Sequence, residues 1–222
     1  PQAELHRAAQ LQFPESMRAM RNLPLSTIGR SSMAHCSTLL SRVGVEVDLA
    51  SIFDALAPRG IGRFDFGSPE TLRAAIPAGN GLFTARSLAR TYAVLANGGE
   101  LDGVRLLSPS TLERATTRAG TTGGRHAVVP FDMQWRLGYH GIVTTRGIPR
   151  QAFGHFGFGG SGAWADPERN MALALIVNSG MGSPFGDLRT ARVSGAALAC
   201  VSELTGTKPA SLLRSLSQWG TA

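Results

Sequence analysis

The feature that most constrains the fold is a change of hydrophobic pattern in the second half of the chain. After residue 130, four short segments have the composition of strands: MQWRLGY (133–139), AFGHFG (152–157), GAWAD (162–166) and MALALIVN (171–178). The residues DPERN (166–170) join the last two and predict a hairpin. The final segment is apolar on both faces, which suits a sheet covered by helices on each side.

Helix signals surround these strands. Thr84 can cap a helix that Gly98 ends. The Asp102-Gly103 pair lies between two β-favouring runs and predicts a small hairpin. Ser108 and Pro109 are typical of the start of a further helix.

A closing helix is expected over 183–204, with Ser183 and Pro184 at its start. We expect residues 1–75 to be mostly helical and irregular, residues 76–206 to form the main domain, and residues 207–222 to be a weakly ordered tail. The order of elements predicts an α+β fold, an antiparallel sheet meander flanked by helices, rather than alternating βαβ units.

Composition limits the classes of function. The net charge is +7, and the basic residues are 21 Arg and one Lys, Lys208. The charges form no run and no aromatic residues interleave with them, so no nucleic-acid partner is expected. The segment from Arg114 to Arg150 holds six Arg and one acid, Asp132, which favours an anionic substrate. No run of about 18 apolar residues predicts a transmembrane segment, and the compartment stays open between cytoplasm and cell envelope.

The sequence does not match three familiar site patterns: a phosphate-binding loop, a nucleophile elbow and a metal site of paired histidines. GFGGSG (157–162) lacks the Lys of a phosphate-binding loop. GGSGA (159–163) approaches a nucleophile elbow, but no His follows Ser161, as that triad order requires. The five His have no paired metal-ligand spacing. The two cysteines, Cys36 and Cys200, are expected to be free buried thiols.

The stretch GHFGFGGSGAWADPERNMALALIVN (154–178) resembles the third motif and following strands of the serine β-lactamase and penicillin-binding protein superfamily. It is most similar to class C β-lactamases and their family VIII carboxylesterase relatives. One strand of that superfamily carries K-T-G, or H-x-G in many esterase-like members, and His155, Phe156 and Gly157 match the second form. Residues 76–117 resemble the superfamily's middle segment. The resemblance implies a β-lactamase/transpeptidase-like fold, incomplete in this chain.

The resemblance also implies roles for individual residues at one wall of an acyl-transfer cleft. His155 would offer a cation or a hydrogen-bond donor to the substrate or the general base. Gly157 would let the strand edge approach the substrate closely, and the backbone N–H of Phe158 would stabilise the oxyanion. The implied substrate-binding residues are Phe156, Gly159 and Asn178. No metal and no cofactor are implied.

Two catalytic motifs of the superfamily are absent from the sequence. The nucleophile lies in S-x-x-K and a tyrosine lies in Y-x-N. Lys208 follows Thr205 by three residues, and neither Tyr92 nor Tyr139 begins Y-x-N. The chain alone is therefore expected to be inactive.

The resulting hypothesis is the C-terminal part of a serine hydrolase, a carboxylesterase or lipase that cleaves small acyl esters through an acyl-enzyme. Its nucleophile would lie outside the chain, in an N-terminal half of the same fold supplied by the same gene or another chain. An esterase is favoured because a Lys, as in K-T-G, would better hold a β-lactam carboxylate. The alternatives are a non-catalytic binding module, or an enzyme acting on β-lactams or peptidoglycan peptides.

Overall fold

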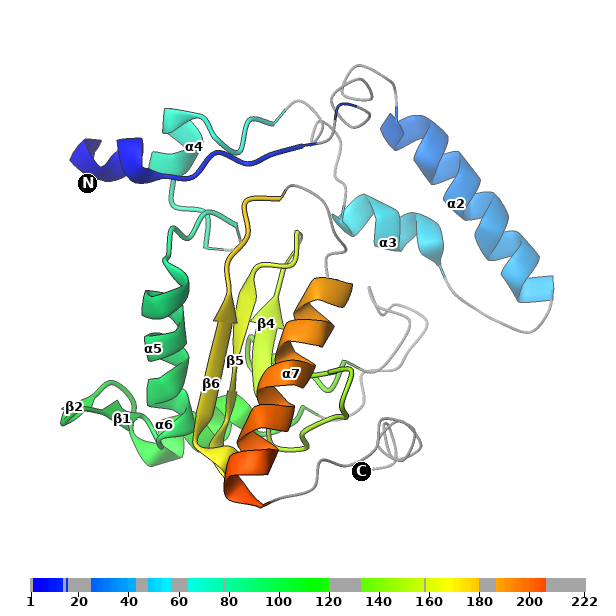
Figure 1. The fold of residues 1–222 in the computed structure, drawn as a ribbon. Coiled ribbons are helices and arrows are strands. Elements are labelled where there is room, and N and C mark those ends of the chain that lie inside the picture. The colour runs from blue at the N-terminus through cyan, green and yellow to red at the C-terminus, as the bar shows by residue number, and fades with distance from the viewer. Residues whose placement is uncertain are drawn as a thin grey trace. The chain divides into compact units, whose positions relative to one another are not determined.

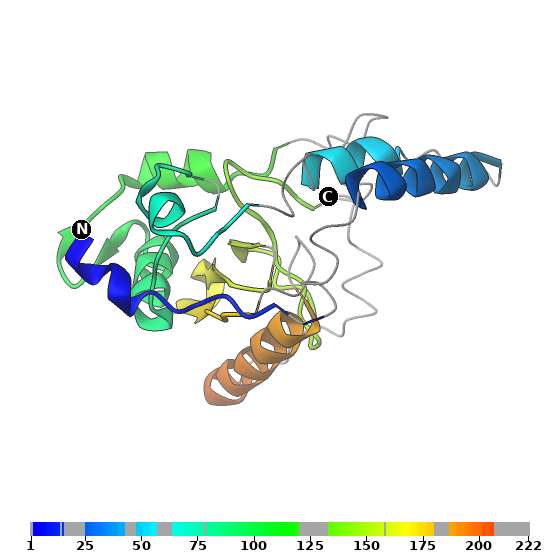
Figure 2. The ribbon, with the colours of Figure 1, turned by 90° about the horizontal axis from the view of Figure 1, so that it is seen from above.

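The computed structural model divides the chain into two compact units, each described here by itself (Figures 1 and 2). The first comprises residues 1–82 and 122–132, and the second comprises residues 83–121 and 133–222. The structure describes residues 2–13, 15, 25–42, 48–56, 64–77, 79–119, 133–157, 159–179 and 187–206. The tail expected over 207–222 lies outside the described residues, and the domain boundary expected at residue 76 stays a prediction.

The first unit is helical where it is described. Its elements are the 3-10 helix η1 (Gln2–Arg7) and the helices α2 (Leu25–Arg42), α3 (Leu49–Leu56) and α4 (Pro69–Arg73). Helices α2 and α3 pack against each other, and the Leu49 N–H donates to Ser37 Oγ at 2.9 Å. Ser68 caps α4 by accepting the Thr71 N–H.

The second unit is built on a four-stranded antiparallel sheet. Its strands are β3 (His140–Gly141), β4 (Phe153–Phe156), β5 (Gly162–Asp166) and β6 (Met171–Leu175), in the order β3-β4-β5-β6. The predicted hairpin between β5 and β6 is confirmed, and the 3-10 helix η3 (Pro167–Arg169) forms its turn. Buried Asp166 caps that turn and pairs with Arg169 at 2.8 Å. The predicted α+β class is confirmed.

Alternate side chains of the sheet enter two separate core clusters. Ala165 and Phe153 pack with Leu95 of α5 (Ala85–Ala96) on one face. Trp164 and Phe156 pack on the other face, toward α7 (Leu188–Thr205). Because neighbouring residues of a strand point to opposite faces, the two helices cover opposite sides of the sheet, as Figure 1 shows.

Helix α7 is tied to the sheet by a buried hydrogen bond. The indole N–H of Trp164 donates to Ser194 Oγ at 3.0 Å, and both residues have 0% of their surface exposed. A buried indole needs such a partner, since its N–H loses water on folding. The bond therefore fixes α7 along the sheet as well as satisfying the donor.

The local predictions around α5 are confirmed. Thr84 caps this helix in a capping box with Ser87. Strands β1 (Glu100–Leu101) and β2 (Val104–Arg105) pair as a hairpin through Asp102 and Gly103, at φ 52° and 76°. Both central residues thus take the positive φ of the tight hairpin turn. Helix α6 (Pro109–Thr116) follows, capped by Ser108.

Two predicted element limits are wrong. Residues 133–139 form no strand, and β3 starts only at His140. Positive φ values at Gln134 (53°) and Gly138 (79°) interrupt the extended chain there. Helix α7 begins at Leu188 with Asp187 as its cap; the expected cap pair, Ser183 and Pro184, lies outside the described residues.

The expectation that both cysteines are buried is also wrong, although both are free. Cys36 and Cys200 are exposed. Helix α7 buries Ser194, Leu198 and Ser202, which recur every four residues along one face. Cys200 lies two positions from Leu198 and so points away from the sheet. None of the helices in the described part of the chain could cross a membrane.

The spacing of β4 and β5 requires glycine at two positions. A Cβ on Gly154 would lie 2.2 Å from the Ala163 carbonyl oxygen, and one on Gly162 would lie 2.2 Å from that of His155. We expect Gly154→Ala or Gly162→Ala to lower the free energy of unfolding by about 1–3 kcal/mol, because the strands must move apart. Urea unfolding followed by tryptophan fluorescence measures this.

The control is Gly157→Ala, at the end of the same segment. Among the described residues outside its immediate neighbours, the nearest atom to a Cβ there is the Ser161 carbonyl oxygen, at 4.0 Å. Its free energy of unfolding should change by less than about 1 kcal/mol. Equal losses in all three variants would show that the spacing of the strands is not the cause.

Candidate active site

The H-x-G segment lies at the C-terminal end of β4. His155 is exposed and shares the strand face of Phe153, the face toward α5. Phe156 points the other way and is buried in the core, with 4% of its surface exposed. Its side chain therefore packs in the core beneath the H-x-G segment. Gly157 directly follows the strand, and Phe158 lies outside the described residues.

Aromatic and imidazole rings surround the base of this segment. The rings of His140 and His155 have centroids 5.1 Å apart. Desolvation by the surrounding atoms lowers the pKa of both imidazoles, of the buried His140 and also of His155, whose ring is partly covered although the residue is exposed. Burial, and then the neighbouring Tyr139, raise the pKa of Tyr92 to about 12. At neutral pH the protein thus favours the neutral form of His155, which can donate one hydrogen bond, and keeps Tyr92 protonated.

A tight turn follows the H-x-G segment. The Gly157 N–H donates to the Ser161 carbonyl, and the Gly160 N–H donates back to the Gly157 carbonyl, both at 3.0 Å. Gly159 and Gly160 have φ values of 92° and 87°, which L-residues with a side chain rarely adopt. A Cβ on Gly160 would also meet Asp187 Oδ2 at 2.8 Å. Turn geometry and packing thus account for both glycines.

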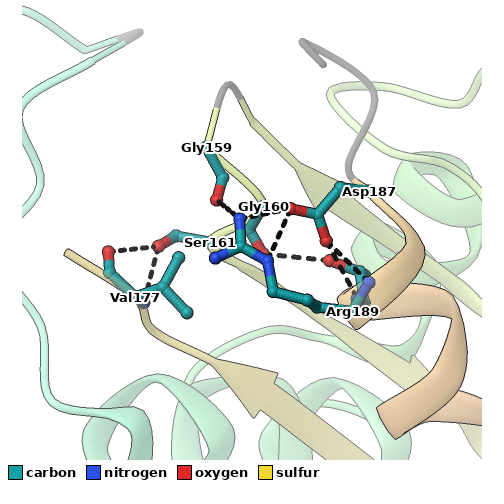
Figure 3. Close-up of polar contacts among 7 residues, drawn as sticks. Gly159, Gly160, Ser161, Val177, Asp187 and Arg189 are labelled. Carbon is teal, nitrogen blue, oxygen red and sulfur yellow. Dashed lines mark hydrogen bonds and ion pairs between the residues drawn. The ribbon is translucent and has the colours of Figure 1, made fainter. Parts of the chain in front are cut away.

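Ser161 has a structural role. Its hydroxyl donates to the Val177 carbonyl at 3.0 Å and accepts the Val177 N–H at 2.9 Å (Figure 3). The hydroxyl therefore links the segment just before β5 to the segment just after β6, beyond the last paired residues of the two strands. This geometry agrees with the sequence argument that Ser161 is not a nucleophile.

Asn178 lies beside the turn. It is exposed and follows β6 by three residues. Both of its neighbours touch the turn: Val177 bonds Ser161, and the Ser179 carbonyl would lie 2.7 Å from a Cβ on Gly159. The fold thus places Asn178 between two residues that contact the turn after the H-x-G segment.

The N-terminus of α7 holds the turn in place (Figure 3). The Arg189 guanidinium donates to the Gly159 carbonyl at 3.0 Å, and Thr190 Oγ1 donates to the Gly160 carbonyl at 3.1 Å. Asp187 accepts the backbone N–H groups of both Arg189 and Thr190 and pairs with the guanidinium. The hydrogen bond from Arg189 is the main reason why the pKa of Asp187 lies below its ordinary value. We call Asp187, Arg189 and Thr190 the turn clamp.

Sequence reasoning missed two parts of this site. It gave no role to His140, or to the turn clamp. The only local signal for the clamp is Asp187, a good helix cap. No signal indicated that Arg189 would reach a carbonyl 30 residues earlier. Within the described ranges, no group of three or more His, Cys, Asp or Glu could hold a metal ion.

Comparison with known proteins identifies the family. The family model described as Beta-lactamase matches residues 16–197, more than half of the chain. The chain therefore belongs to the Beta-lactamase family. Esterases are among the proteins to which it is similar.

Three relatives illustrate the match. The "Esterase/beta-lactamase LipL" of Mycobacterium tuberculosis is 45% identical over 113 residues, or 50% of this chain. A penicillin-binding protein homolog from Caulobacter crescentus is 35% identical with a TM-score of 0.56, and a family VIII carboxylesterase is 28% identical with a TM-score of 0.54. Each structure matches 69% of this chain. The chain spans 25% of LipL and 41% of each solved chain.

The turn clamp generates a prediction about local opening. Arg189→Gln or Thr190→Val removes one bond to the turn, so the Gly160 N–H should exchange with solvent faster. For Arg189→Gln the free energy of unfolding should change by less than about 1 kcal/mol, because 47% of the Arg189 side chain is exposed. For Thr190→Val it should fall by about 1–2 kcal/mol, because the hydrogen bond that is lost is buried. Hydrogen exchange and urea unfolding measure the two effects separately.

The matched control is Arg192→Gln, which removes an exposed arginine three residues further along the same helix. It should leave exchange in the turn unchanged. If Arg192→Gln accelerates exchange as much as Arg189→Gln does, the turn responds to the charge of α7 and not to the clamp.

Proposed function

We propose that this chain is the C-terminal part of a serine carboxylesterase of the Beta-lactamase family and forms one wall of its acyl-transfer cleft. The observation that carries the proposal is the H-x-G segment, His155 to Gly157, at the C-terminal end of a strand in this fold, with His155 exposed. The substrate would be a small acyl ester, hydrolysed through an acyl-enzyme.

The proposed roles are those that the resemblance to the superfamily implies for each group. The Phe158 N–H donates to the oxyanion that forms when the ester carbonyl is attacked, and one such donor contributes about 10²–10³ in rate. Gly157 lets the substrate approach the backbone, with no Cβ in the way. His155 donates a hydrogen bond to the substrate or the general base, and Gly159 and Asn178 line the substrate side of the wall.

The state of His155 supports an ester over a β-lactam. Its pKa is lowered by burial, so it presents a neutral donor near neutral pH. A K-T-G lysine would instead present a permanent cation suited to a carboxylate. Two of the similar proteins are described as esterases, one of them also as a β-lactamase. We therefore place esters first and β-lactams second.

The nucleophile is proposed to lie outside these 222 residues. The sequence contains no S-x-x-K and no Y-x-N, and the Ser161 hydroxyl already donates its hydrogen to the Val177 carbonyl. Among the described residues, β6 is an edge strand with no partner on its outer side. Unpaired edges are usually covered, and an N-terminal half of the same fold would supply both the cover and the serine.

Active-site labelling tests this assignment. The protein made from its full reading frame should hydrolyse p-nitrophenyl esters and react with a fluorophosphonate probe at the serine of an S-x-x-K motif. Peptide mapping should place no label within residues 1–222. Stoichiometric labelling at a serine of this chain would overturn the proposed location of the nucleophile. No hydrolysis and no labelling would favour the non-catalytic binding module.

Substitution of His155 tests its role. We expect His155→Ala to lower kcat/KM for p-nitrophenyl butyrate by about 10- to 100-fold, because it removes a hydrogen bond at the reacting group. His155→Lys restores the cation of K-T-G and should shift the ratio of kcat/KM values toward nitrocefin, which carries a carboxylate. The same ratio in both variants would show that the charge at position 155 does not select the substrate.

A further inference from the structure

The edge of β4 that carries the H-x-G segment has a gap in its backbone pairing. Strand β3 is two residues long and pairs His140 with Gly154 and Gly141 with Phe153. Its register with β4 ends before Phe156. The N–H of Phe156 is nevertheless buried and has a partner, the imidazole Nε2 of His140, at 3.2 Å. A side chain of β3 thus replaces the backbone partner that a longer strand would supply.

The two contacts of this imidazole define its protonation. His140 Nδ1 lies 2.8 Å from the Gly141 carbonyl oxygen, which can only accept, so Nδ1 carries the hydrogen. Nε2 faces an N–H group, which can only donate, so Nε2 carries no hydrogen and accepts the bond. The arrangement requires the neutral Nδ1–H tautomer. In the imidazolium form, an Nε2–H would face the Phe156 N–H, and the hydrogen bond would be lost.

The surroundings of His140 favour the neutral form. Only 4% of the residue is exposed, and Trp135 and Phe156 pack against the ring. The charged and titratable groups facing it are His155 on β4 and Arg136 in the segment before β3; both would repel a second positive charge. Burial is the largest cause of the lowered pKa of His140, and these two groups add to it.

We propose that His140 is a positioning residue for the reaction: its neutral imidazole holds the Phe156 N–H, and with it the H-x-G segment, and protonation releases that segment. The inference rests on the proposed function, because it concerns the alignment of the same oxyanion wall. His140 touches neither substrate nor reacting atoms in this role. It acts through the backbone of Phe156, two residues before the proposed oxyanion donor.

Three forms of the protein from its full reading frame test the proposal: the wild type, His140→Gln and His140→Leu. The Gln side chain keeps an acceptor near the position of Nε2 but does not titrate, whereas Leu has no acceptor. With ¹⁵N-labelled His and Phe, nuclear magnetic resonance reports the His140 tautomer, and hydrogen exchange reports the Phe156 N–H. Phe156→Leu assigns the amide signal.

In the wild type we expect the Nδ1–H tautomer and a Phe156 amide that loses protection on acidification, with the same midpoint as His140, below about 6.5. His140→Gln should keep the protection at all pH values. His140→Leu should exchange about 3- to 10-fold faster even at pH 8, as expected for the loss of one hydrogen bond. In ester hydrolysis, kcat should fall more than KM changes in His140→Leu, and Gln should restore it.

The magnetic-resonance results separate this proposal from the proposed function. An Nε2–H tautomer, a pH-independent Phe156 amide, or equal exchange in the Gln and Leu variants would overturn the role of His140, with or without activity. Coupled titration of His140 and the Phe156 amide in a protein that hydrolyses no ester would support the positioning contact and overturn the esterase. If His140→Leu does not fold, the His140 tautomer and the pH dependence of Phe156 amide exchange in the wild type still test the role of His140.

Discussion

The close approach of β4 and β5 is the constraint on which the rest of the second unit depends. Glycines at 154 and 162 let each strand's backbone lie where a Cβ would otherwise meet a carbonyl oxygen of its partner. Along β5, Trp164 faces α7 and Ala165 faces α5, because successive side chains of a strand point to opposite faces. The same pair of strands carries the H-x-G segment, and α7 contacts the turn that joins them. The core and the candidate site thus have one origin.

Helix α7 connects these two regions. Its middle packs on the sheet through Ser194 and Trp164, and its first turn bonds the loop that follows the H-x-G segment. The register that the buried indole fixes is therefore transmitted to the carbonyls of Gly159 and Gly160. Functional geometry held by rigid elements is more precise than geometry held by loops alone. Here a glycine loop obtains that precision from the helix beside it.

Local signals in the sequence predicted much of the fold. The Asp102-Gly103 hairpin, the caps at Thr84 and Ser108 and the β5–β6 hairpin all depend on residues close in sequence, and the structure confirms them. The break at Gln134 could not be predicted, because a positive φ at a glutamine has no sequence signature such as the Asp-Gly pair gives to Asp102. The same limit applies to the site. His140 bonds a residue 16 positions away and Arg189 one 30 positions away, so only the folded chain brings each pair together.

The two hydrogen bonds between the Ser161 hydroxyl and the Val177 backbone affect how mutagenesis would identify the nucleophile in such a protein. The hydroxyl acts as an additional hydrogen-bonded link between the segments that follow β6 and precede β5, in the turn after the H-x-G segment. In a scan that replaces every serine by alanine and records only turnover, Ser161 would be a false positive if losing this link disturbs the strands of the candidate site. Covalent labelling of the serine Oγ, rather than loss of turnover, is the criterion that distinguishes a reactive serine from a structural one.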